Sequence, residues 1–254
     1  MNKNILLGLV AALLFSVEAM ASDLAKEQRW REQVADSIMD GEEVDVMVDG
    51  RGVFGIYTEA AEDSDKGMII AHGIGVHPNW DQVILPLRVE MAERGWHTLS
   101  IQMPILKNEA EARDYFKIYP EAGPRLEAAE KFLEDKGIKT WVYVGHSMGS
   151  QMIALYLSKR NPVQARGFVA VGMNAVQVDP AVNAANSLKN INLPVLDLYG
   201  SKDLDFVLSS AEKKRLAATH NKAYTQKMVK GANHFFDGKN DELIEVVDEW
   251  CSKL

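Results

Sequence analysis

The feature that most constrains the fold is an alternation, from residue 67 to the end, of short apolar runs with longer stretches of helical periodicity. The short runs predict strands, and the longer stretches predict the helices that connect them in a mostly parallel sheet. Because the runs are largely apolar instead of alternating with polar residues, we expect helices on both faces of the sheet. The expected strands are residues 68–71, 98–101, 141–144, 167–172, 195–199 and 224–229, and the expected helices are residues 80–94, 120–136, 148–159, 206–219 and 241–252.

The residues before this pattern predict an antiparallel hairpin. Two apolar-rich runs, residues 44–48 and 53–57, flank Asp49-Gly50, a pair typical of two-residue hairpin turns. Residues 24–40 predict a polar helix or arm that leads into the hairpin. The expected fold class is therefore α/β, with a mostly parallel central sheet, an N-terminal antiparallel hairpin and helices on both faces.

Residues 1–21 have the features of an export signal. Lys3 supplies a positive charge, residues 5–17 form a mostly apolar stretch, and Ala19-Met20-Ala21 fits a cleavage site. The apolar stretch is shorter than the roughly 20 residues that a membrane-spanning helix needs, which argues against an uncleaved anchor. We therefore expect a periplasmic or secreted protein that begins at Ser22, has no stable membrane span, and folds as a single domain over residues 22–254.

Composition narrows the possible partners and cofactors. The chain has 28 Lys+Arg against 36 Asp+Glu, a formal charge of −8, and no basic cluster, which argues against a nucleic-acid partner. The single cysteine, Cys251, excludes an internal disulfide and a cysteine-based metal site. It lies on the apolar face of the last expected helix, which indicates a core residue. No metal and no organic cofactor are expected.

The strongest functional signal is Gly145-His146-Ser147-Met148-Gly149, which lies between an expected strand and an expected helix. In this G-x-S-x-G setting the glycines let the chain turn sharply and leave the serine exposed on a strained turn. The helix N-terminus behind the serine directs free N–H groups and a positive dipole at it. The motif predicts Ser147 as a nucleophile, the alternative being a structural serine in a tight turn.

A serine nucleophile needs a base and an acid that orients the base. Asp203 follows one C-terminal strand and His234 follows the next, which gives the chain order Ser, Asp, His that is typical of α/β-hydrolases. The carboxyl ends of parallel strands, where all three fall, are where ligand and catalytic groups gather. Asp205 is the alternative acid and His220 the alternative base, but Asp203 and His234 are favoured.

The segment His72-Gly73-Ile74-Gly75 follows the first expected parallel strand and is a candidate for the oxyanion hole. A tetrahedral intermediate needs two N–H donors directed at its developing charge. We expect one from Met148 and the other from Ile74 or its neighbour Gly75, with Ile74 preferred. The remaining expectation is that the histidines outside the triad are structural or line the site: His72, His77, His97 and His146.

Residues 67 to about 250 resemble the α/β-hydrolase superfamily through these four motifs, which occur in the superfamily's order. Two strings, HGIGVHPNW at residues 72–80 and GWHTLSIQMP at residues 95–104, more narrowly resemble an uncharacterised family of exported proteobacterial α/β-hydrolases. The superfamily resemblance implies the α/β-hydrolase fold and serine hydrolase chemistry. The narrower one implies export and no particular substrate.

The motifs together predict a serine hydrolase that acts through an acyl-enzyme on an ester, or on a thioester or amide, and most resembles a carboxylesterase. The substrate would be a small or acyl-bearing molecule of unspecified identity. A catalytically silent scaffold of the same fold and an acyltransferase with the same triad are the alternatives.

The predicted substrate pocket is open, because the interval 174–193 is too short for a large lid. Residues 104–119 are polar and are expected to form a solvated connecting helix. Four aromatic residues could shape an acyl slot, but aromatic residues at such spacing more often belong to the core, so no substrate-binding residue is assigned: Trp80, Phe206, Phe235 and Phe236.

Overall fold

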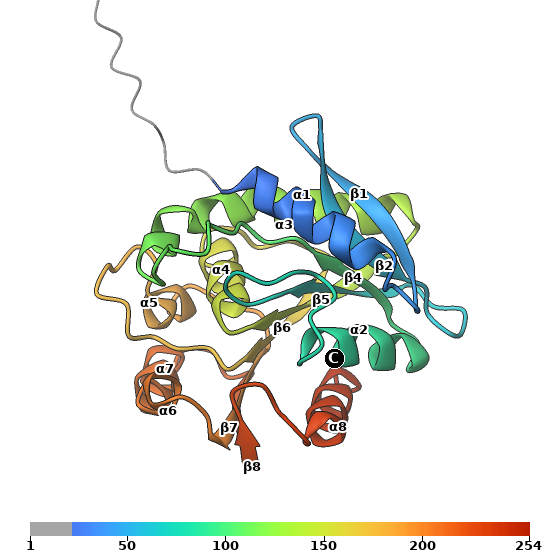
Figure 1. Ribbon diagram of the computed structural model, residues 1–254. Helices are drawn as coiled ribbons and strands as arrows, with labels where there is room; N and C mark the ends of the chain where they lie inside the picture. The colour runs from blue at the N-terminus through green and yellow to red at the C-terminus, as the bar shows by residue number, and fades with distance from the viewer. Residues whose placement is uncertain (1–21) are drawn as a thin grey trace, which may run out of the picture.

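The structure of the protein is a computed structural model that describes residues 22–254. The expected export signal, residues 1–21, lies outside the described residues. One eight-stranded sheet runs through the described chain in the order β1-β2-β4-β3-β5-β6-β7-β8 (Figure 1). Its strands are β1 (Glu42–Val48), β2 (Arg51–Thr58), β3 (Lys66–Ala71), β4 (His97–Ile101), β5 (Thr140–His146), β6 (Ala165–Val171), β7 (Val195–Lys202) and β8 (Tyr224–Asn233).

The first two strands form the predicted hairpin. Val48 pairs with Arg51 across a two-residue turn, in which Asp49 and Gly50 both have positive φ, 48° and 81°. Positive φ at both central positions is the requirement that Asp-Gly satisfies in a hairpin turn. Strand β2 then runs antiparallel to β4, and the six strands from β4 to β8 along the sheet are mutually parallel. The predicted fold class, a mostly parallel sheet with an antiparallel N-terminal pair, is confirmed.

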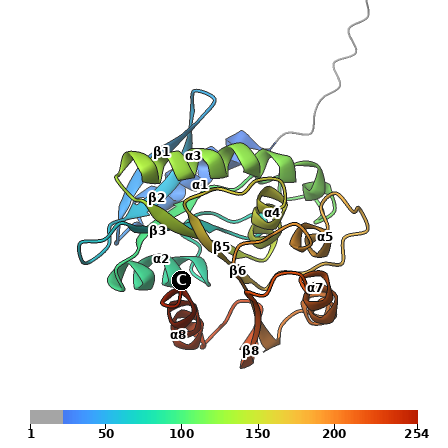
Figure 2. The same ribbon diagram turned by 180° about the vertical axis from the view of Figure 1, so that it is seen from behind.

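Helices cover both faces of the sheet (Figures 1 and 2). The segments 114–117 and 119–121 are short 3₁₀ turns, η1 and η2. None of the helices within residues 22–254 is long and apolar enough to span a membrane. The α-helices are α1 (Leu24–Ala35), α2 (Ile84–Glu93), α3 (Ala122–Asp135), α4 (Met148–Leu157), α5 (Ala184–Leu188), α6 (Asp205–Leu208), α7 (Ala211–Ala217) and α8 (Asn240–Cys251).

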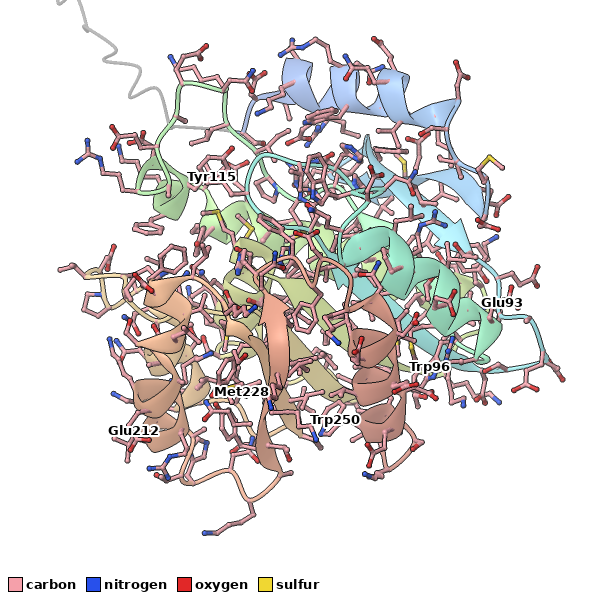
Figure 3. The ribbon with its side chains drawn as sticks, turned by 60° about the horizontal axis from the view of Figure 1, so that its bottom comes forward. Glu93, Trp96, Tyr115, Glu212, Met228 and Trp250 are labelled. Carbon is pink, nitrogen blue, oxygen red and sulfur yellow. The ribbon has the colours of Figure 1, made fainter. Side chains whose placement is uncertain are left out.

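The core has two main layers because successive strand residues point to opposite faces. In β3, Met68 and Ile70 pack in the layer under α2 and α8, whereas Ile69 packs in the layer under α3, α4 and α5. Cys251 is buried in the first of these layers, as its place on the apolar face predicted, and burial raises the pKa of its thiol to about 12. Trp250, labelled in Figure 3, packs half-buried against the same layer.

Three helix predictions need correction. The helix expected at 80–94 begins only at Ile84, which places Pro86 in the first turn of α2, where its missing N–H costs no helical hydrogen bond. The helix expected at 206–219 is broken by a turn at residues 209–210 into α6 and α7, and the hydroxyl of Ser210 in this turn accepts from the N–H of Ala175.

The third correction concerns residues 104–119, which were expected to form a solvated helix. The segment forms no α-helix: it is irregular before η1, with turns at residues 108–109 and 112–113, and it buries apolar side chains in the core beside α4. Several apolar side chains of the segment face the core although it forms no α-helix, and its polar side chains lie between them in sequence. The buried members are Ile105, Leu106, Tyr115, Ile118 and Tyr119.

Candidate active site

The loop between β5 and α4 holds Ser147 in a strained conformation, with φ 52° and ψ −118°. Positive φ is uncommon for a residue other than glycine and marks a backbone that its surroundings hold in place. The glycines of the motif make this turn possible because other backbone atoms approach them more closely than a side chain would allow. A Cβ on Gly145 would lie 2.5 Å from Ser150 Cα, and one on Gly149 would lie 2.4 Å from the carbonyl oxygens of Ala71 and His72.

The structure brings Ser147, His234 and Asp203 into one hydrogen-bonded line. Ser147 Oγ lies 2.9 Å from His234 Nε2, and His234 Nδ1 lies 2.6 Å from Asp203 Oδ1. Because a carboxylate only accepts, Nδ1–H donates to Asp203, and Nε2 is left to accept the serine proton. Asp203 and His234 are buried, and the N–H of Leu204 also donates to Asp203 Oδ1, at 2.7 Å.

The two alternative residues lie elsewhere. Asp205 is exposed at the start of α6. His220 is exposed in the turn after α7, where its Nε2 lies 3.2 Å from the carbonyl oxygen of Ile191. Neither one contacts Ser147 or His234 in the described hydrogen-bond network, so the geometry favours Asp203 and His234 for the two roles.

Two residues that the sequence motifs did not assign also hold His234. Gly172, at the end of β6 with φ 61°, leaves space for the imidazole, since a Cβ there would lie 2.9 Å from His234 Cε1. His146 Nε2 lies 3.0 Å from the carbonyl oxygen of His234. Burial lowers the pKa of His146 to about 4, so the ring is neutral at pH 7 and its Nε2–H donates to that oxygen. In the sequence, the one signal for Gly172 was a glycine at the end of the expected strand 167–172.

The two expected oxyanion donors lie on either side of Ser147. Met148 is the first residue of α4, and Ile74 lies in the loop after β3. Gly73, next to Ile74, lies close to the nucleophile, because a Cβ on it would be 3.4 Å from Ser147 Cβ. In the hydrogen bonds of residues 22–254, the N–H groups of Ile74 and Met148 have no protein acceptor. Both donors are therefore available to a bound oxyanion.

His72 fixes the orientation of the peptide group that carries the Ile74 N–H. Its Nδ1–H donates to the carbonyl oxygen of Gly73 (2.8 Å), which belongs to the same peptide unit. Its Nε2 accepts from the N–H of Met103 and from the side-chain amide of Gln102, both at 2.9 Å. Burial lowers the pKa of His72 to about 3. The ring is therefore neutral at pH 7. It positions the loop and transfers no proton to or from a substrate.

Beside Ser147 lies an apolar cavity of about 250 Å³. Among residues 22–254, no carboxylate, lysine or arginine lines it, and several of its apolar side chains are partly exposed. Phe236, one of the four aromatic residues considered above, is instead fully buried in the core. The lining residues are Gly73, Ile74, Val76, Trp80, His146, Ser147, Leu204, Phe206, His234 and Phe235.

Because aromatic residues at such spacing more often belong to the core, none of the four considered above was assigned to substrate binding from the sequence, yet three of them line this cavity. They come from the loop before α2, from α6 and from the loop after β8, and only the folded chain gathers them. The available signal was their position within a few residues after each site motif: Trp80 five residues after Gly75, Phe206 three residues after Asp203, and Phe235 directly after His234.

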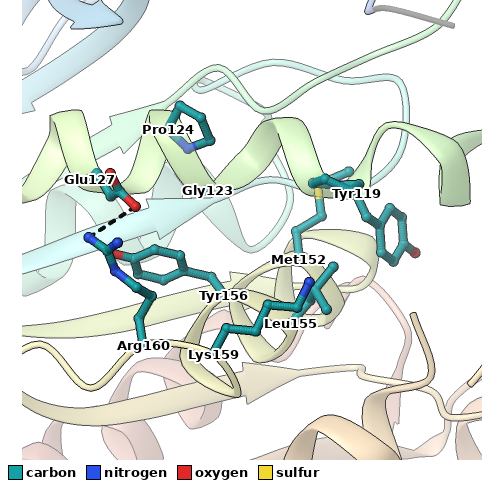
Figure 4. Close-up of a pocket in the computed structure, with 10 residues that line it drawn as sticks. Tyr119, Gly123, Pro124, Glu127, Met152, Leu155, Tyr156, Lys159 and Arg160 are labelled. Atoms are coloured by element: carbon teal, nitrogen blue, oxygen red, sulfur yellow. Dashed lines mark ion pairs between the residues drawn. The ribbon is translucent and has the colours of Figure 1, made fainter. Parts of the chain in front are cut away.

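A second cavity of about 250 Å³ lies between α3 and α4 and shares no lining residue with the first (Figure 4). Glu127 and Arg160, which both line it, form an ion pair at 3.0 Å. None of the residues discussed above as site residues lines it. Within residues 22–254, no group of three or more His, Cys, Asp or Glu side chains is arranged to hold a metal ion.

Solved structures with the same fold include several that carry esterase or hydrolase names. The chain is similar to Est1E from Butyrivibrio proteoclasticus, with a TM-score of 0.64 and 16% identity over 84% of this chain and 98% of that chain. It is similar to a dienelactone hydrolase from Anabaena variabilis, with a TM-score of 0.65 and 19% identity over 83% and 96% of the two chains. The third is the Pyrococcus furiosus esterase Pf2001, with a TM-score of 0.67 and 16% identity over 84% and 92%.

These similarities confirm the α/β-hydrolase fold. No curated protein matches the chain by sequence. A family profile described as "Protein of unknown function (DUF3530)" matches residues 18–124 and 121–253, which together cover nearly all of the described chain. The chain belongs to the DUF3530 family and has the α/β-hydrolase fold.

Proposed function

We propose that the protein is a serine hydrolase that cleaves carboxylic esters through an acyl-enzyme. The observation that carries the proposal is the line of two hydrogen bonds from Ser147 through His234 to Asp203, with a strained serine backbone at one end and a buried carboxylate at the other. The esterase and hydrolase names among the structural neighbours support it.

The first half-reaction forms the acyl-enzyme. Ser147 Oγ attacks the ester carbonyl carbon while its proton passes to His234 Nε2, and Asp203 stabilises the resulting imidazolium. The carbonyl oxygen becomes an oxyanion that accepts from the N–H groups of Ile74 and Met148. The bond to the leaving oxygen then breaks, and the alcohol takes the proton from His234.

The second half-reaction releases the acid. Water gives a proton to His234 Nε2 and attacks the acyl carbon, which forms a second oxyanion at the same two N–H groups. This intermediate collapses with cleavage of the bond to Ser147 Oγ, which regains the proton from His234. No step requires a metal or an organic cofactor.

The cavity beside Ser147 favours an uncharged acyl group of modest size. Its volume is about 250 Å³, and three aromatic side chains, Trp80, Phe206 and Phe235, line it without a cationic partner for a substrate carboxylate. A flat aromatic acyl group can stack on such side chains at little cost in conformational entropy. One solved structure of Est1E contains ferulic acid, an aromatic acid, which makes aryl esters a reasonable first substrate panel.

The test compares the wild type with Ser147→Ala on a panel of aryl and short-chain alkyl esters. Removal of the nucleophile should lower kcat/KM on the best ester by about 10³ or more. Ser158→Ala, at the other end of α4, is the matched control and should retain activity. A fluorophosphonate probe should label Ser147 in the wild type and in the control only.

The same experiment separates the other candidate activities. Turnover that persists in Ser147→Ala would exclude the serine mechanism, and a wild type that neither labels nor turns over an ester would indicate a silent scaffold. Alcohols added as competing acceptors would reveal an acyltransferase by the appearance of the exchanged ester.

We also propose that the protein is exported and that cleavage before Ser22 produces its mature N-terminus, on the sequence features of residues 1–21. The surroundings of Ser22, the proposed mature N-terminus, support this proposal. Ser22 is buried, and its backbone N–H donates to Glu121 Oε2 at 3.2 Å, so an α-ammonium at Ser22 would pair with that carboxylate. N-terminal sequencing of the protein from a periplasmic fraction should begin at Ser22.

A further inference from the structure

The N-terminal helix α1 contacts the loop that carries the proposed oxyanion donor. The indole N–H of Trp30 donates to the carbonyl oxygen of Gly75 at 3.2 Å. Gly75 has φ 72° and is the residue after Ile74. Its Cα is closely surrounded, because a Cβ built on it would lie 3.5 Å from Tyr115 Oη and 3.8 Å from Lys26 Nζ (Tyr115 is labelled in Figure 3).

Trp30 also packs on the wall of the substrate cavity through one intermediate ring. Its ring centroid lies 4.7 Å from that of His77, and His77 lies 5.4 Å from Trp80 in an edge-to-face arrangement. Burial lowers the pKa of His77 to about 4, so these three rings form a neutral stack at pH 7. Trp30 therefore contacts the loop at Gly75 and, two residues later, at His77.

Polar contacts help to hold α1 in this position. Its buried residues are Lys26, Glu27 and Val34. Lys26 Nζ donates to the carbonyl oxygen of Leu106 at 2.9 Å, and Glu27 forms an ion pair of 2.8 Å with the buried Arg125. Helix propensity alone is too weak to hold a helix of this length on a surface, so these contacts determine where α1 lies.

Arg125 also links α1 to the start of the loop that carries Ile74. It donates to the carbonyl oxygen of Gln102 at 2.9 Å, and the side-chain amide of Gln102 donates to His72 Nε2 at 2.9 Å. His72 in turn holds the carbonyl oxygen of Gly73. The loop on which Ile74 lies is thus held on one side through Arg125 and His72 and on the other directly by Trp30.

We propose that α1 is a positioning element of the active site and that Trp30 is its positioning residue. Trp30 fixes the carbonyl of Gly75, and with it the turn that directs the Ile74 N–H at the oxyanion. This inference rests on the proposed function. A donor that is displaced by a fraction of an ångström weakens transition-state stabilisation while leaving ground-state binding in the cavity nearly unchanged.

The test replaces the indole by rings that lack its N–H. Trp30→Phe keeps an aromatic ring on His77, and incorporation of β-(3-benzothienyl)alanine at position 30 replaces only the N–H by sulfur. We expect kcat to fall about tenfold in both, which corresponds to the loss of about 1.4 kcal/mol of transition-state stabilisation. KM should stay within about twofold, and Tm should change little.

A second readout reports on the oxyanion hole directly. A trifluoromethyl ketone forms a tetrahedral adduct with a catalytic serine, so its inhibition constant should rise in parallel with the loss in kcat. The product carboxylic acid, which forms no such adduct, should bind with unchanged affinity. Trp250→Phe is the matched control, because Trp250 is also half-buried but lies on α8, and it should retain wild-type kcat.

The outcomes distinguish this proposal from the one on which it rests. If Ser147→Ala abolishes turnover but both Trp30 variants keep kcat within twofold of the wild type, α1 has no positioning role. Parallel losses of kcat and Tm in the Trp30 and Trp250 variants would equally refute it, since they would indicate general destabilisation. If Ser147→Ala remains active, the proposed function itself fails.

Discussion

At the residue scale, the placement of His234 depends on the absence of a side chain at Gly172. The imidazole occupies the space where a Cβ would be, and the left-handed backbone conformation at this position already favours glycine. A glycine outside every catalytic motif therefore contributes to the alignment of the base. The role of Gly172 can be inferred only from the structure, because it depends on the proximity of His234.

Replacement of this glycine should impair activity far more than a comparable replacement elsewhere. In Gly172→Ala, the new Cβ would lie 2.9 Å from His234 Cε1, so the ring must shift from its position beside Ser147 and Asp203. We expect kcat/KM on an ester to fall by at least about tenfold, since a small misplacement of a catalytic group costs that much or more. Steady-state kinetics checks the loss.

Gly137→Ala is the control, because Gly137 also has positive φ, 85°, but a Cβ there meets nothing within 4 Å. Both variants carry the same kind of backbone strain, about 1 kcal/mol of stability, which urea denaturation measures. Equal activity of the two variants would show that His234 adapts to the added methyl group.

At the scale of elements, α7 is attached to the sheet through a buried ion pair. Lys214 Nζ lies 2.6 Å from Asp197 Oδ1 and donates also to the carbonyl oxygen of Met173 at 2.6 Å, and both charged side chains are fully buried. The preceding helix α6 carries Phe206 of the substrate cavity. The ion pair thus holds the α6–α7 segment against β7 and supports one wall of the site.

Loss of the lysine should destabilise the protein strongly, because Asp197 would be left as an unpaired buried charge. For Lys214→Met we expect the free energy of unfolding to fall by about 3–5 kcal/mol, measured by urea denaturation at pH 7. The neighbouring Lys213→Met removes an exposed lysine that donates to the carbonyl oxygen of Ala175, and it should cost less than about 1 kcal/mol. Similar losses in both variants would contradict a dominant role of the buried pair.

At the scale of the whole molecule, buried neutral histidines lower the stability of the folded protein at acidic pH. His72 and His146 are buried, and burial lowers their pKa values from 6.5 to about 3 and about 4. Above pH 6.5 both are neutral in the folded and unfolded chains and contribute no pH dependence. As the pH falls below 6.5, the unfolded chain takes up two protons that the folded chain cannot accept, so the folded state loses stability.

The free energy of unfolding should therefore decrease between pH 6.5 and about 4, with a contribution from these two histidines that approaches about 2–3 kcal/mol per pH unit near pH 5. Urea denaturation at a series of pH values measures this slope. His146→Gln, which keeps a donor for the His234 carbonyl, should reduce the contribution by about half. His220→Gln, at an exposed position, should not change it. A slope that is unaffected by His146→Gln would disprove the assignment.

The order of the strands, the hairpin turn and the strand-to-helix turn at Ser147 could be predicted from local sequence. These features are encoded locally: periodicity sets the element type, and Asp49-Gly50 and the glycines of the G-x-S-x-G motif permit backbone conformations that most residues resist. The motifs also predicted which three residues the structure brings together, because the carboxyl ends of parallel strands meet at one edge of the sheet.

The residues that surround Ser147, His234 and Asp203 could not be predicted from the sequence, because they come together only in the folded chain. Trp30 and Gly75 are 45 residues apart, and the aromatic cavity draws on three separate loops or helices. No local pattern distinguishes such residues from core, because burial against a distant segment depends on how whole elements pack. The turn that separates α6 from α7 also makes a distant contact, because the Ser210 hydroxyl accepts from the N–H of Ala175, 35 residues away in sequence.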